Sequence, residues 1–218
     1  LGPSGCGKST IFRLVNKLLT PDAGRVLVNG QQIESLKDYC GYMPQHDLLF
    51  PWRTVRENVM LPMEIQGGYT KAEMLERADE ALASVGLSDW GQKSPRELSG
   101  GMRQRAAFAR TVLTGSDLLL LDEPFSALDY QTRLTVSADI AAMIRKAEKS
   151  VILITHDLAE AISLADRVLI LSARPARVKA EFPIHLTAAD HSPLAARRAP
   201  EYGQLFNQIW EELSNENN

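Results

Sequence analysis

The sequence predicts an α/β fold in which helices cover both faces of a parallel β-sheet. Short apolar segments typical of buried strands alternate with segments of helical periodicity between residues 118 and 171. Such alternation is typical of parallel sheets, because each crossover between parallel strands needs a connection long enough to hold a helix. A glycine-rich turn at residues 2–7 also leads straight into a helical segment, which is a common opening for folds of this class.

The first forty residues contain a helix signal and a hairpin signal. Apolar residues recur at helical spacing over Ser9–Leu19, and Pro21 marks the end of that segment. Two short extended runs follow in Arg25–Ile33, and the dipeptide Asn29-Gly30 between them suits a tight turn. We therefore expect one helix followed by a small β-hairpin.

The middle of the chain contains one strand signal and two helix signals. A strand is expected at Cys40–Met43. Further along, Thr70 and Glu73 have the spacing of a capping box at the start of an amphipathic helix. Another helix is expected over Ser99–Leu113, which ends just before a glycine.

The remaining elements alternate up to residue 171 and then give way to a proline-rich stretch. The alternating elements are strand Leu118–Leu121, a helix over about Thr132–Lys149, strand Val151–Thr155, a helix over about Leu158–Ala165 and strand Arg167–Leu171. Prolines block long helices beyond Ser172 until a last amphipathic segment. Its apolar face consists of Tyr202, Leu205, Phe206, Ile209, Trp210 and Leu213. Packing on its own domain is the favoured interpretation of this helix, and docking to a partner is the alternative.

The composition excludes several classes of protein. The 218 residues, 44% hydrophobic and 23% charged, fit one large or two small globular domains. The 24 Lys and Arg residues against 27 Asp and Glu give a net charge of −3, so we expect no nucleic acid partner. Cys6 and Cys40 match no metal-ligand or disulfide spacing, which favours a reducing cytoplasmic setting. Apolar runs such as Ser150–Thr155 are shorter than the ~20 residues that span a membrane, so any membrane association is expected to come through a partner.

The segment that begins the chain matches the pattern GxxxxGK[ST] over residues 2–9. In this pattern, glycines let backbone N–H groups curve around phosphate oxygens, and the next helix directs its positive end at them. Lys8 is expected to reach the β- and γ-phosphates, Ser9 to bind Mg²⁺, and Thr10 to bond a phosphate oxygen. The expected nucleotide contacts are Gly2, Pro3, Ser4, Gly5, Cys6, Gly7, Lys8, Ser9 and Thr10. A chance glycine turn is the alternative for this motif alone.

A second candidate site follows the apolar run that ends at residue 121. The strand delivers Asp122 and Glu123 to the carboxyl edge of the predicted sheet, where ligands bind in open α/β folds. Asp122 is expected to hold Mg²⁺, and Glu123 to orient and deprotonate the attacking water. Two solvated carboxylates at a strand end are the alternative interpretation.

A third motif is the octapeptide LSGGMRQR at residues 98–105, which resembles the signature of ABC ATPases. By itself Ser99 is only a helix N-cap, and the glycines beside it leave backbone N–H groups that can bind an anion. Other motifs stand in the order of that family and extend from Gly2 to Asp157. They are Gln45 in YMPQHD, the Asp122-Glu123 strand, the segment Ser126–Asp129 and His156 in LITHD.

The resemblance implies a role for each of these residues. Gln45 would contact Mg²⁺ and the water, and would link the site to the transport partner. His156 would contact the γ-phosphate, and Asp129 would act across a dimer interface. Ser99, Gly100 and Gly101 would complete the site of a second copy of the chain, so that two subunits enclose two ATP molecules. The expected catalytic residues are then Lys8, Gln45, Glu123 and His156.

The resemblance also implies a fold and an assembly. We expect a P-loop NTPase fold of three α/β/α layers at residues 1–172, with a small β-hairpin region and a helical subdomain inserted at about 46–105. Residues 173–218 would form an extension that ends in the amphipathic helix. The segments His46–Pro62 and Leu171–Val178 resemble importers of the nitrate, sulfonate and taurine type. These importers imply two transmembrane permease subunits, an external solute-binding protein and a position at the cytoplasmic face of the membrane.

Two further expectations concern the start of the chain and the rival functions. A phosphate-binding loop normally follows a buried strand, so we expect that the first strands and an adenine-stacking aromatic lie upstream of Leu1.

One alternative function is an ABC ATPase of DNA repair, chromosome organisation or translation. The other is a nucleotide-binding module that does not hydrolyse ATP, which intact Lys8, Asp122, Glu123 and His156 disfavour.

Overall fold

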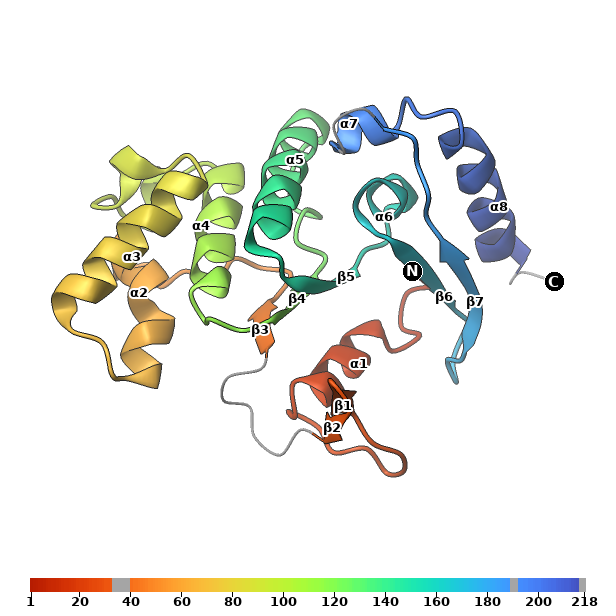
Figure 1. Ribbon diagram of the computed structural model, residues 1–218, viewed down its shortest axis with the longest axis horizontal. Helices are drawn as coiled ribbons and strands as arrows, with labels where there is room; N and C mark the ends of the chain where they lie inside the picture. Colours follow the sequence, from red (N-terminus) through yellow and green to blue (C-terminus); the bar gives the residue numbers. More distant parts are fainter. Residues whose placement is uncertain (33–39, 189–191, 216–218) are drawn as a thin grey trace. The chain divides into compact units, whose positions relative to one another are not determined.

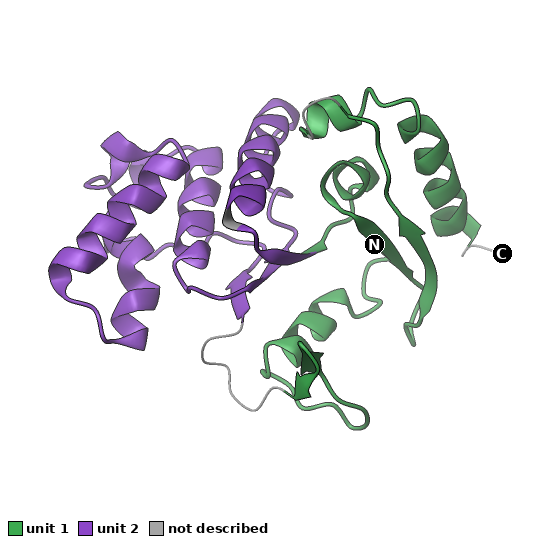
Figure 2. Cartoon of the chain, in the orientation of Figure 1, with its two compact units in different colours: residues 1–36, 153–218 green, residues 37–152 purple. Residues whose placement is uncertain are grey.

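A computed structural model describes residues 1–32, 40–188 and 192–215 of the chain (Figure 1). The chain divides into two compact units (Figure 2). Unit 1 contains residues 1–36 and 153–218, and unit 2 contains residues 37–152. Each unit is described separately below.

A short sheet forms the centre of unit 2. Its strands are β3 (Cys40–Met43), β4 (Leu118–Asp122) and β5 (Ser150–Ile154), in the order β3-β4-β5, and the last two residues of β5 are counted with unit 1. β3 and β4 are parallel, which confirms the predicted parallel pairing for these two strands. The leucines at positions 119–121 of β4 are at most 1% exposed. This degree of burial explains why β4 is an unbroken apolar run rather than an alternating one.

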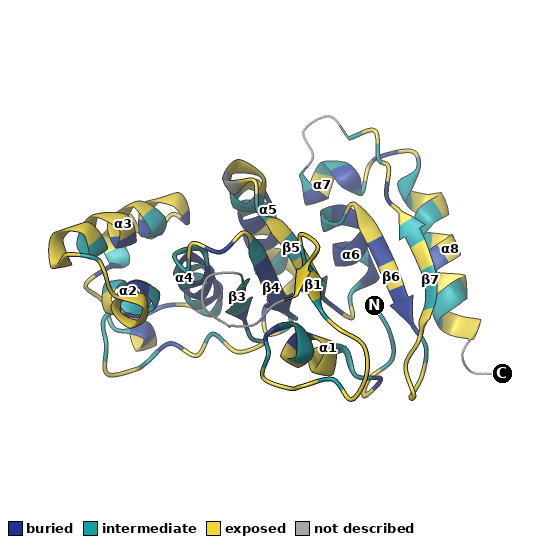
Figure 3. Cartoon of the chain, turned by 60° about the horizontal axis from the view of Figure 1, so that its bottom comes forward, coloured by how far each residue is buried: buried dark blue, intermediate teal, exposed yellow. Residues whose placement is uncertain are grey.

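The helices of unit 2 are amphipathic and begin at side-chain caps. They are α2 (Val55–Gln66), α3 (Lys71–Ser84), α4 (Gly100–Val112) and α5 (Tyr130–Ala147), with 3₁₀ turns η1 (Ser88–Trp90) and η2 (Pro95–Glu97). α2, α3 and α4 pack against one another (Figure 1). On α3, Ala78 and Leu82 are buried and the charged side chains are exposed. Figure 3 shows the buried and exposed positions along this helix. The predicted capping box of α3 is present, because Thr70 and Glu73 each bond the other's backbone N–H.

The sequence analysis did not predict α2. Its start carries a capping box formed by Thr54 and Glu57, which is a signal that could have revealed it. Pro62 lies inside the helix, where proline normally interrupts helical hydrogen bonding. Burial of Val55, Val59 and Met63 stabilises the helix despite that residue.

The first part of unit 1 contains a helix and a hairpin. α1 (Lys8–Val15) precedes β1 (Leu27–Val28) and β2 (Gln31–Gln32), which pair antiparallel. Asn29 and Gly30 have φ of 51° and 78°, as the two central residues of a type I′ turn require. The predicted hairpin is confirmed, and its last predicted residue, Ile33, lies outside the described residues.

The predicted helix over Ser9–Leu19 is too long at its C-terminal end. α1 ends at Val15, and Lys17 adopts a left-handed conformation with φ 59°. The N–H groups of Leu18 and Leu19 then donate to the carbonyl of Arg13. Bonds of this kind satisfy the last carbonyls of a helix and end it, although the apolar periodicity continues in the sequence.

The second part of unit 1 is a hairpin covered by helices. It contains α6 (Leu158–Leu164), β6 (Arg167–Leu171), β7 (Val178–Pro183), α7 (Pro193–Ala196) and α8 (Tyr202–Ser214). β6 pairs antiparallel with β7, a strand that the sequence analysis missed. Pro183 ends β7, so the strand lies in a stretch that we expected to be irregular. The backbone of Leu1 also bonds β6, donating to Leu169 and accepting from Leu171.

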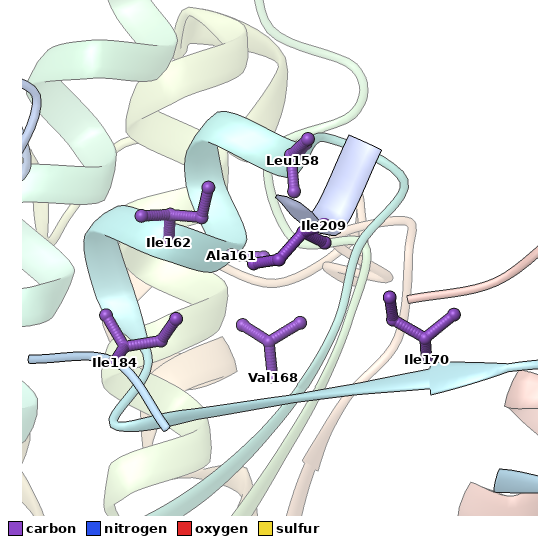
Figure 4. Close-up of a cluster of buried hydrophobic side chains, with 7 residues drawn as sticks. All are labelled: Leu158, Ala161, Ile162, Val168, Ile170, Ile184 and Ile209. Carbon is purple, nitrogen blue, oxygen red and sulfur yellow. The ribbon is translucent and has the colours of Figure 1, made fainter. Parts of the chain in front are cut away.

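A hydrophobic cluster holds the elements of this second part together (Figure 4). Its buried members are Leu158, Ala161, Ile162, Val168, Ile170, Ile184 and Ile209. Ile209 of α8 is fully buried, so the last helix packs on its own unit as the favoured interpretation predicted. Among the described helices, none has both the length and the apolar character that a membrane span requires.

Candidate functional site

The glycine-rich loop of unit 1 depends on backbone conformations that favour glycine. Gly5 and Gly7 have φ of 77° and 113°, a region that residues with a side chain rarely adopt. Apart from the adjoining residues of the chain, no atom lies within 4 Å of a Cβ at either position, so backbone conformation rather than lack of space requires glycine there. At Gly2, by contrast, a Cβ would lie 3.0 Å from the backbone oxygen of Leu171. The loop is therefore open at Gly5 and Gly7 and closely packed at Gly2.

The first turn of α1 directs its backbone N–H groups at this loop. Gly7 is the N-cap of α1 and forms no side-chain cap, and helix N-termini of this kind bind anions. The ammonium group of Lys8 donates to the carbonyls of Gly2 and Pro3, at 2.8 Å each. Ser9 and Thr10 are exposed in the same turn. The first turn of α1 thus places one cation, the hydroxyl groups of Ser9 and Thr10 and backbone N–H donors next to the loop.

A cluster of polar side chains lies at the carboxyl edge of the sheet in unit 2. Because Met43 of β3 pairs with Leu121 of β4, the residues that follow the two strands lie side by side. The amide nitrogen Nε2 of Gln45 lies 3.2 Å from Oε2 of Glu123 and donates to it. It also lies 3.4 Å from the hydroxyl of Ser126. The structure therefore brings Gln45 and Glu123 together although 78 positions separate them in the chain.

The two carboxylates after β4 have different surroundings. Asp122 is 7% exposed, and its Oδ2 accepts a hydrogen bond from the hydroxyl of Tyr42 at 3.3 Å. Glu123 is less buried and has φ 47°, an uncommon conformation for a residue with a side chain. The sequence analysis did not single out Tyr42. Its position three residues before Gln45, on the neighbouring strand, is the signal that could have found it.

Side chains of α4 hold the segment that follows Gln45. Arg103 Nε donates to Oδ2 of Asp47 at 3.0 Å, and Arg110 donates to the carbonyls of Asp47 and Leu48. Desolvation by burial lowers the pKa of Arg110, and the nearby charge of Asp47 opposes that shift. Gln104 reaches the carbonyl of Gln45 at 3.5 Å. None of these three α4 side chains was predicted as a site residue.

The signature segment begins α4 and packs closely on α5. Ser99 is the N-cap of α4, and its exposed hydroxyl accepts from the N–H of Met102 at 3.3 Å. A Cβ at Gly101 would lie only 2.6 Å from Cγ2 of Thr132. At Gly100 the nearest atom would be 3.6 Å away, an ordinary contact. Close helix packing therefore explains the glycine at position 101 before any ligand is considered.

Asp129 and His156 also lie at helix starts. Asp129 is the N-cap of α5, and hydrogen bonds from the side chain and backbone N–H of Thr132 lower its pKa. His156 is exposed and lies between β5 and α6. Its neighbour Thr155 donates to the buried carboxylate of Glu160 at 2.7 Å and accepts from the N–H of Asp157. These bonds fix the backbone on both sides of the histidine.

The predicted site residues thus fall into two groups. The loop Gly2–Thr10 and His156 belong to unit 1, and the other predicted residues, from Gln45 to Asp129, belong to unit 2. Across residues 1–32, 40–188 and 192–215, no three His, Cys, Asp or Glu side chains gather as a group that could hold a metal ion. Mg²⁺ prefers oxygen ligands and commonly takes one or two carboxylates plus phosphate oxygens. Within unit 1 the exposed hydroxyl of Ser9, and within unit 2 the carboxylate of Asp122, are each groups of that chemical kind.

The chain is similar to a protein family and to several proteins of other organisms. The family model described as ABC transporter matches residues 1–126. An uncharacterized ABC transporter ATP-binding protein of Bacillus subtilis is 43% identical over 98% of this chain and 82% of its own length. The nitrate import ATP-binding protein of a Synechocystis strain is 39% identical, covering 96% of this chain and 80% of that protein. The taurine import ATP-binding protein of Pseudomonas aeruginosa is 38% identical, with 98% and 82% covered.

Solved structures show the same fold. The ATP-binding cassette MJ0796, in a dimeric post-hydrolysis state with ADP and Pi, matches with a TM-score of 0.72 and 28% identity. That match covers 84% of this chain and 83% of the other. The protein cbiO1 of Clostridium perfringens, part of the ABC transporter complex cbiONQ, matches with a TM-score of 0.71 and 28% identity, covering 78% and 70%. The predicted P-loop NTPase fold is confirmed by these matches.

Proposed function

Because the chain belongs to the ABC transporter family and is an ATPase of that family, we propose that it powers an importer for a small solute of the nitrate, sulfonate or taurine class. The observation that carries this proposal is the similarity to nitrate and taurine import proteins over 96–98% of the chain. The solute itself is outside the reach of an ATPase subunit, which contacts only nucleotide and partner proteins.

In unit 1, we propose that residues Gly2–Thr10 bind the phosphates of ATP. Open space beside Gly5 and Gly7 leaves room for phosphate oxygens against the backbone N–H groups. Lys8 exchanges its bonds to the loop carbonyls for bonds to the β- and γ-phosphates. Thr10 bonds a phosphate oxygen, and Cys6, which is buried, fills space behind the loop.

We propose that Ser9, Gln45 and Asp122 hold Mg²⁺ beside the nucleotide. The Nε2 group of Gln45 donates to Glu123 and Ser126, which leaves its Oε1 atom as the oxygen donor. The ion would supply charge neutralisation for the phosphates. The hydroxyl of Tyr42 orients Asp122 for this role through the hydrogen bond at Oδ2.

Glu123 is proposed as the general base for the attacking water. Its carboxylate is held by Gln45, whose amide also contacts Ser126, so the base is positioned by residues from two neighbouring strand ends. His156 contacts the γ-phosphate and stabilises the charge that develops there. Phosphoryl transfer needs mostly positioning and charge stabilisation, which this set of residues can supply.

We further propose that two copies of the chain act together. Ser99, Gly100 and Gly101 of one copy complete the nucleotide site of the other, Asp129 contacts the facing copy, and ATP binding closes the dimer. Two transmembrane permease subunits would hold this dimer at the cytoplasmic face of the membrane, with an external solute-binding protein delivering the solute. The exposed Trp52, stacked on Phe50 at 4.9 Å, suits a surface that receives a permease helix.

We also propose that the chain divides into an ATPase domain and a C-terminal extension. Residues 1–172 would form the ATPase domain, with the helical subdomain inserted at about 46–105 and the extension at 173–218. The mutual packing of α2, α3 and α4 supports a helical subdomain, with α4 continuing beyond that range to Val112.

Substitution of Glu123 by Gln tests the proposed chemistry. We expect Glu123→Gln to lower ATP hydrolysis by ~10²–10⁴-fold, the usual contribution of a general base, while ATP binding is retained. Glu148→Gln is a matched control, because Glu148 is an exposed glutamate that also has positive φ, at 52°. Hydrolysis is measured by phosphate release in the assembled transporter. Normal hydrolysis by Glu123→Gln would contradict the assignment of the base, and no hydrolysis by the unmodified chain would support a binding module instead.

A further inference from the structure

A pocket of about 470 Å³ adjoins the phosphate loop within unit 1. One wall consists of loop and α1 residues, namely Gly5, Cys6, Gly7, Thr10 and Ile11. The other wall consists of the end of β6, the turn that joins β6 to β7 and the first residue of β7.

The turn presents two arginines to the pocket. Arg174 and Arg177 both line it, and both are exposed. Among the described residues, neither guanidinium group forms an ion pair with a carboxylate. Elsewhere on the same hairpin, Arg167 is paired with Glu181 at 3.1 Å. The hairpin therefore carries one arginine neutralised by a partner and two that are available to an anion.

The backbone holds the turn in a defined shape. The N–H of Ser172 donates to the carbonyl of Arg177 at 2.9 Å, and the N–H of Arg177 donates to the hydroxyl of Ser172 at 3.0 Å. β6 and β7 remain paired up to Leu171 and Val178. Because the turn is closed by these bonds, its arginines stay at the pocket rather than on a loose loop.

The chemistry of the two walls is complementary to a polyphosphate. The loop wall offers backbone N–H groups at the open positions of Gly5 and Gly7 and the hydroxyl of Thr10. The turn wall adds two guanidinium groups, which form strong, charge-assisted hydrogen bonds with phosphate oxygens. An anion bound at the loop would therefore have arginine donors on the opposite wall of the same pocket.

We propose that Arg174 and Arg177 belong to the nucleotide site and bind phosphate oxygens of the nucleotide held by the loop. This inference rests on the proposed function of residues 2–10 as the phosphate-binding loop. It adds to that function a second source of positive charge, supplied by the β6–β7 turn of the same subunit.

The test compares the binding of ATP and of inorganic tripolyphosphate by titration calorimetry on the full chain. The variants are the double substitutions Arg174→Ala/Arg177→Ala and Arg174→Lys/Arg177→Lys. Arg167→Ala/Arg198→Ala is the matched control, because it removes the same charge from exposed arginines of unit 1 that do not line this pocket. Lys8→Ala reports on the phosphate loop itself.

We expect the double alanine variant to bind both ATP and tripolyphosphate about tenfold more weakly, the size of effect expected for lost charge-assisted hydrogen bonds. The Arg167→Ala/Arg198→Ala control should bind both ligands as the unmodified chain does, and the double lysine variant should bind them more tightly than the double alanine variant. The difference in affinity between the double alanine variant and the unmodified chain should shrink at high salt. Tripolyphosphate is informative because it has no base or ribose.

Three results would overturn the inference. Unchanged ATP binding by the double alanine variant, alongside weak binding by Lys8→Ala, would refute the arginine contacts and leave the phosphate loop in place. Weaker ATP binding with unchanged tripolyphosphate binding would move the contact to the nucleoside and refute the phosphate assignment. Unchanged binding by Lys8→Ala would refute the proposed function and this inference with it.

Discussion

In unit 1, the loop Gly2–Gly7 bonds mainly to itself, whereas in unit 2 the polar cluster is assembled from residues far apart in the chain. Lys8 donates to two carbonyls only five and six positions away. Gln45, by contrast, reaches Glu123 across 78 positions, and Tyr42 reaches Asp122 across 80. The loop is a local structure, and the cluster exists only because β3 and β4 pair in one register.

Glycine is required for a different physical reason in each region. Gly5 and Gly7 have positive φ and open space around them, so an added methyl group would strain the backbone without a clash. At Gly101 the constraint is the space available, because an added Cβ would collide with Thr132. The comparison shows that a motif glycine can present backbone to a ligand or permit close packing of two helices. The following changes test the contrast between the two regions, in order of expected size.

The largest effect is expected from Lys8→Ala in the loop. Loss of the one cation that the loop contains should lower ATP hydrolysis by about 10²–10³-fold, comparable to the removal of a single donor to developing charge. Binding of ATP should weaken as well, whereas Glu123→Gln in unit 2 should affect hydrolysis alone. Calorimetry together with phosphate release separates the two effects.

Lys146→Ala is the control for that change, because Lys146 is an exposed lysine near the end of α5 in unit 2. It should bind and hydrolyse ATP as the unmodified chain does. If Lys8→Ala kept both ATP affinity and hydrolysis, the loop could not be the phosphate site, and the contrast between the two regions would lose its basis.

A smaller effect is expected from Gly101→Ala in unit 2. The new methyl group would approach Cγ2 of Thr132 to 2.6 Å, and overpacking of this kind lowers the free energy of unfolding by about 1–3 kcal/mol. Gly100→Ala is the control, because its Cβ would meet only an ordinary contact at 3.6 Å. Urea unfolding of both variants gives the comparison. Equal free energies of unfolding would show that α4 and α5 can separate at no cost.

The smallest effect concerns acid sensitivity of the helices in unit 2. Hydrogen bonds from the backbone N–H of Thr54 and of Thr70, and then from their hydroxyls, lower the pKa of Glu57 and Glu73 below the ordinary value of 4.5. For Glu97, the N–H of Ser94 is the main cause and Lys93 the second. A carboxyl group whose pKa is lower in the folded state stabilises folding above its unfolded pKa. That contribution is lost as the pH falls through the folded pKa.

We therefore expect α2 and α3 to become less protected in acid, below a pH of about 4.5, the ordinary pKa of these side chains. Amide hydrogen exchange measured on both sides of that pH reports on each helix separately. Glu73→Gln should remove part of the pH dependence at α3 and leave that at α2 unchanged. Identical acid sensitivity of α3 in the variant and the unmodified chain would contradict a capping role for that carboxylate.

Local signals determined much of the structure from the sequence alone. The capping box at Thr70 and Glu73 and the turn at Asn29-Gly30 were predicted correctly, because each depends on residues within one turn of the chain. The order of the motifs identified the family before any contact was known. Neither kind of signal involves the distance between remote residues, so both can be read along a linear sequence.

Tertiary structure decided what depends on pairing between distant segments. The contact of Gln45 with Glu123 and the bond of Tyr42 to Asp122 follow from the register of β3 and β4, which composition does not encode. β7 was missed because pairing with β6 outweighs its weak sequence pattern, and the early end of α1 was missed because its last carbonyls are bonded by N–H groups of a turn. For β7, pairing with β6 outweighs the sequence pattern, and for α1, local hydrogen bonds end the helix although the apolar periodicity continues. The sequence by itself determined which chemical groups this protein carries, and the fold decided which of them meet.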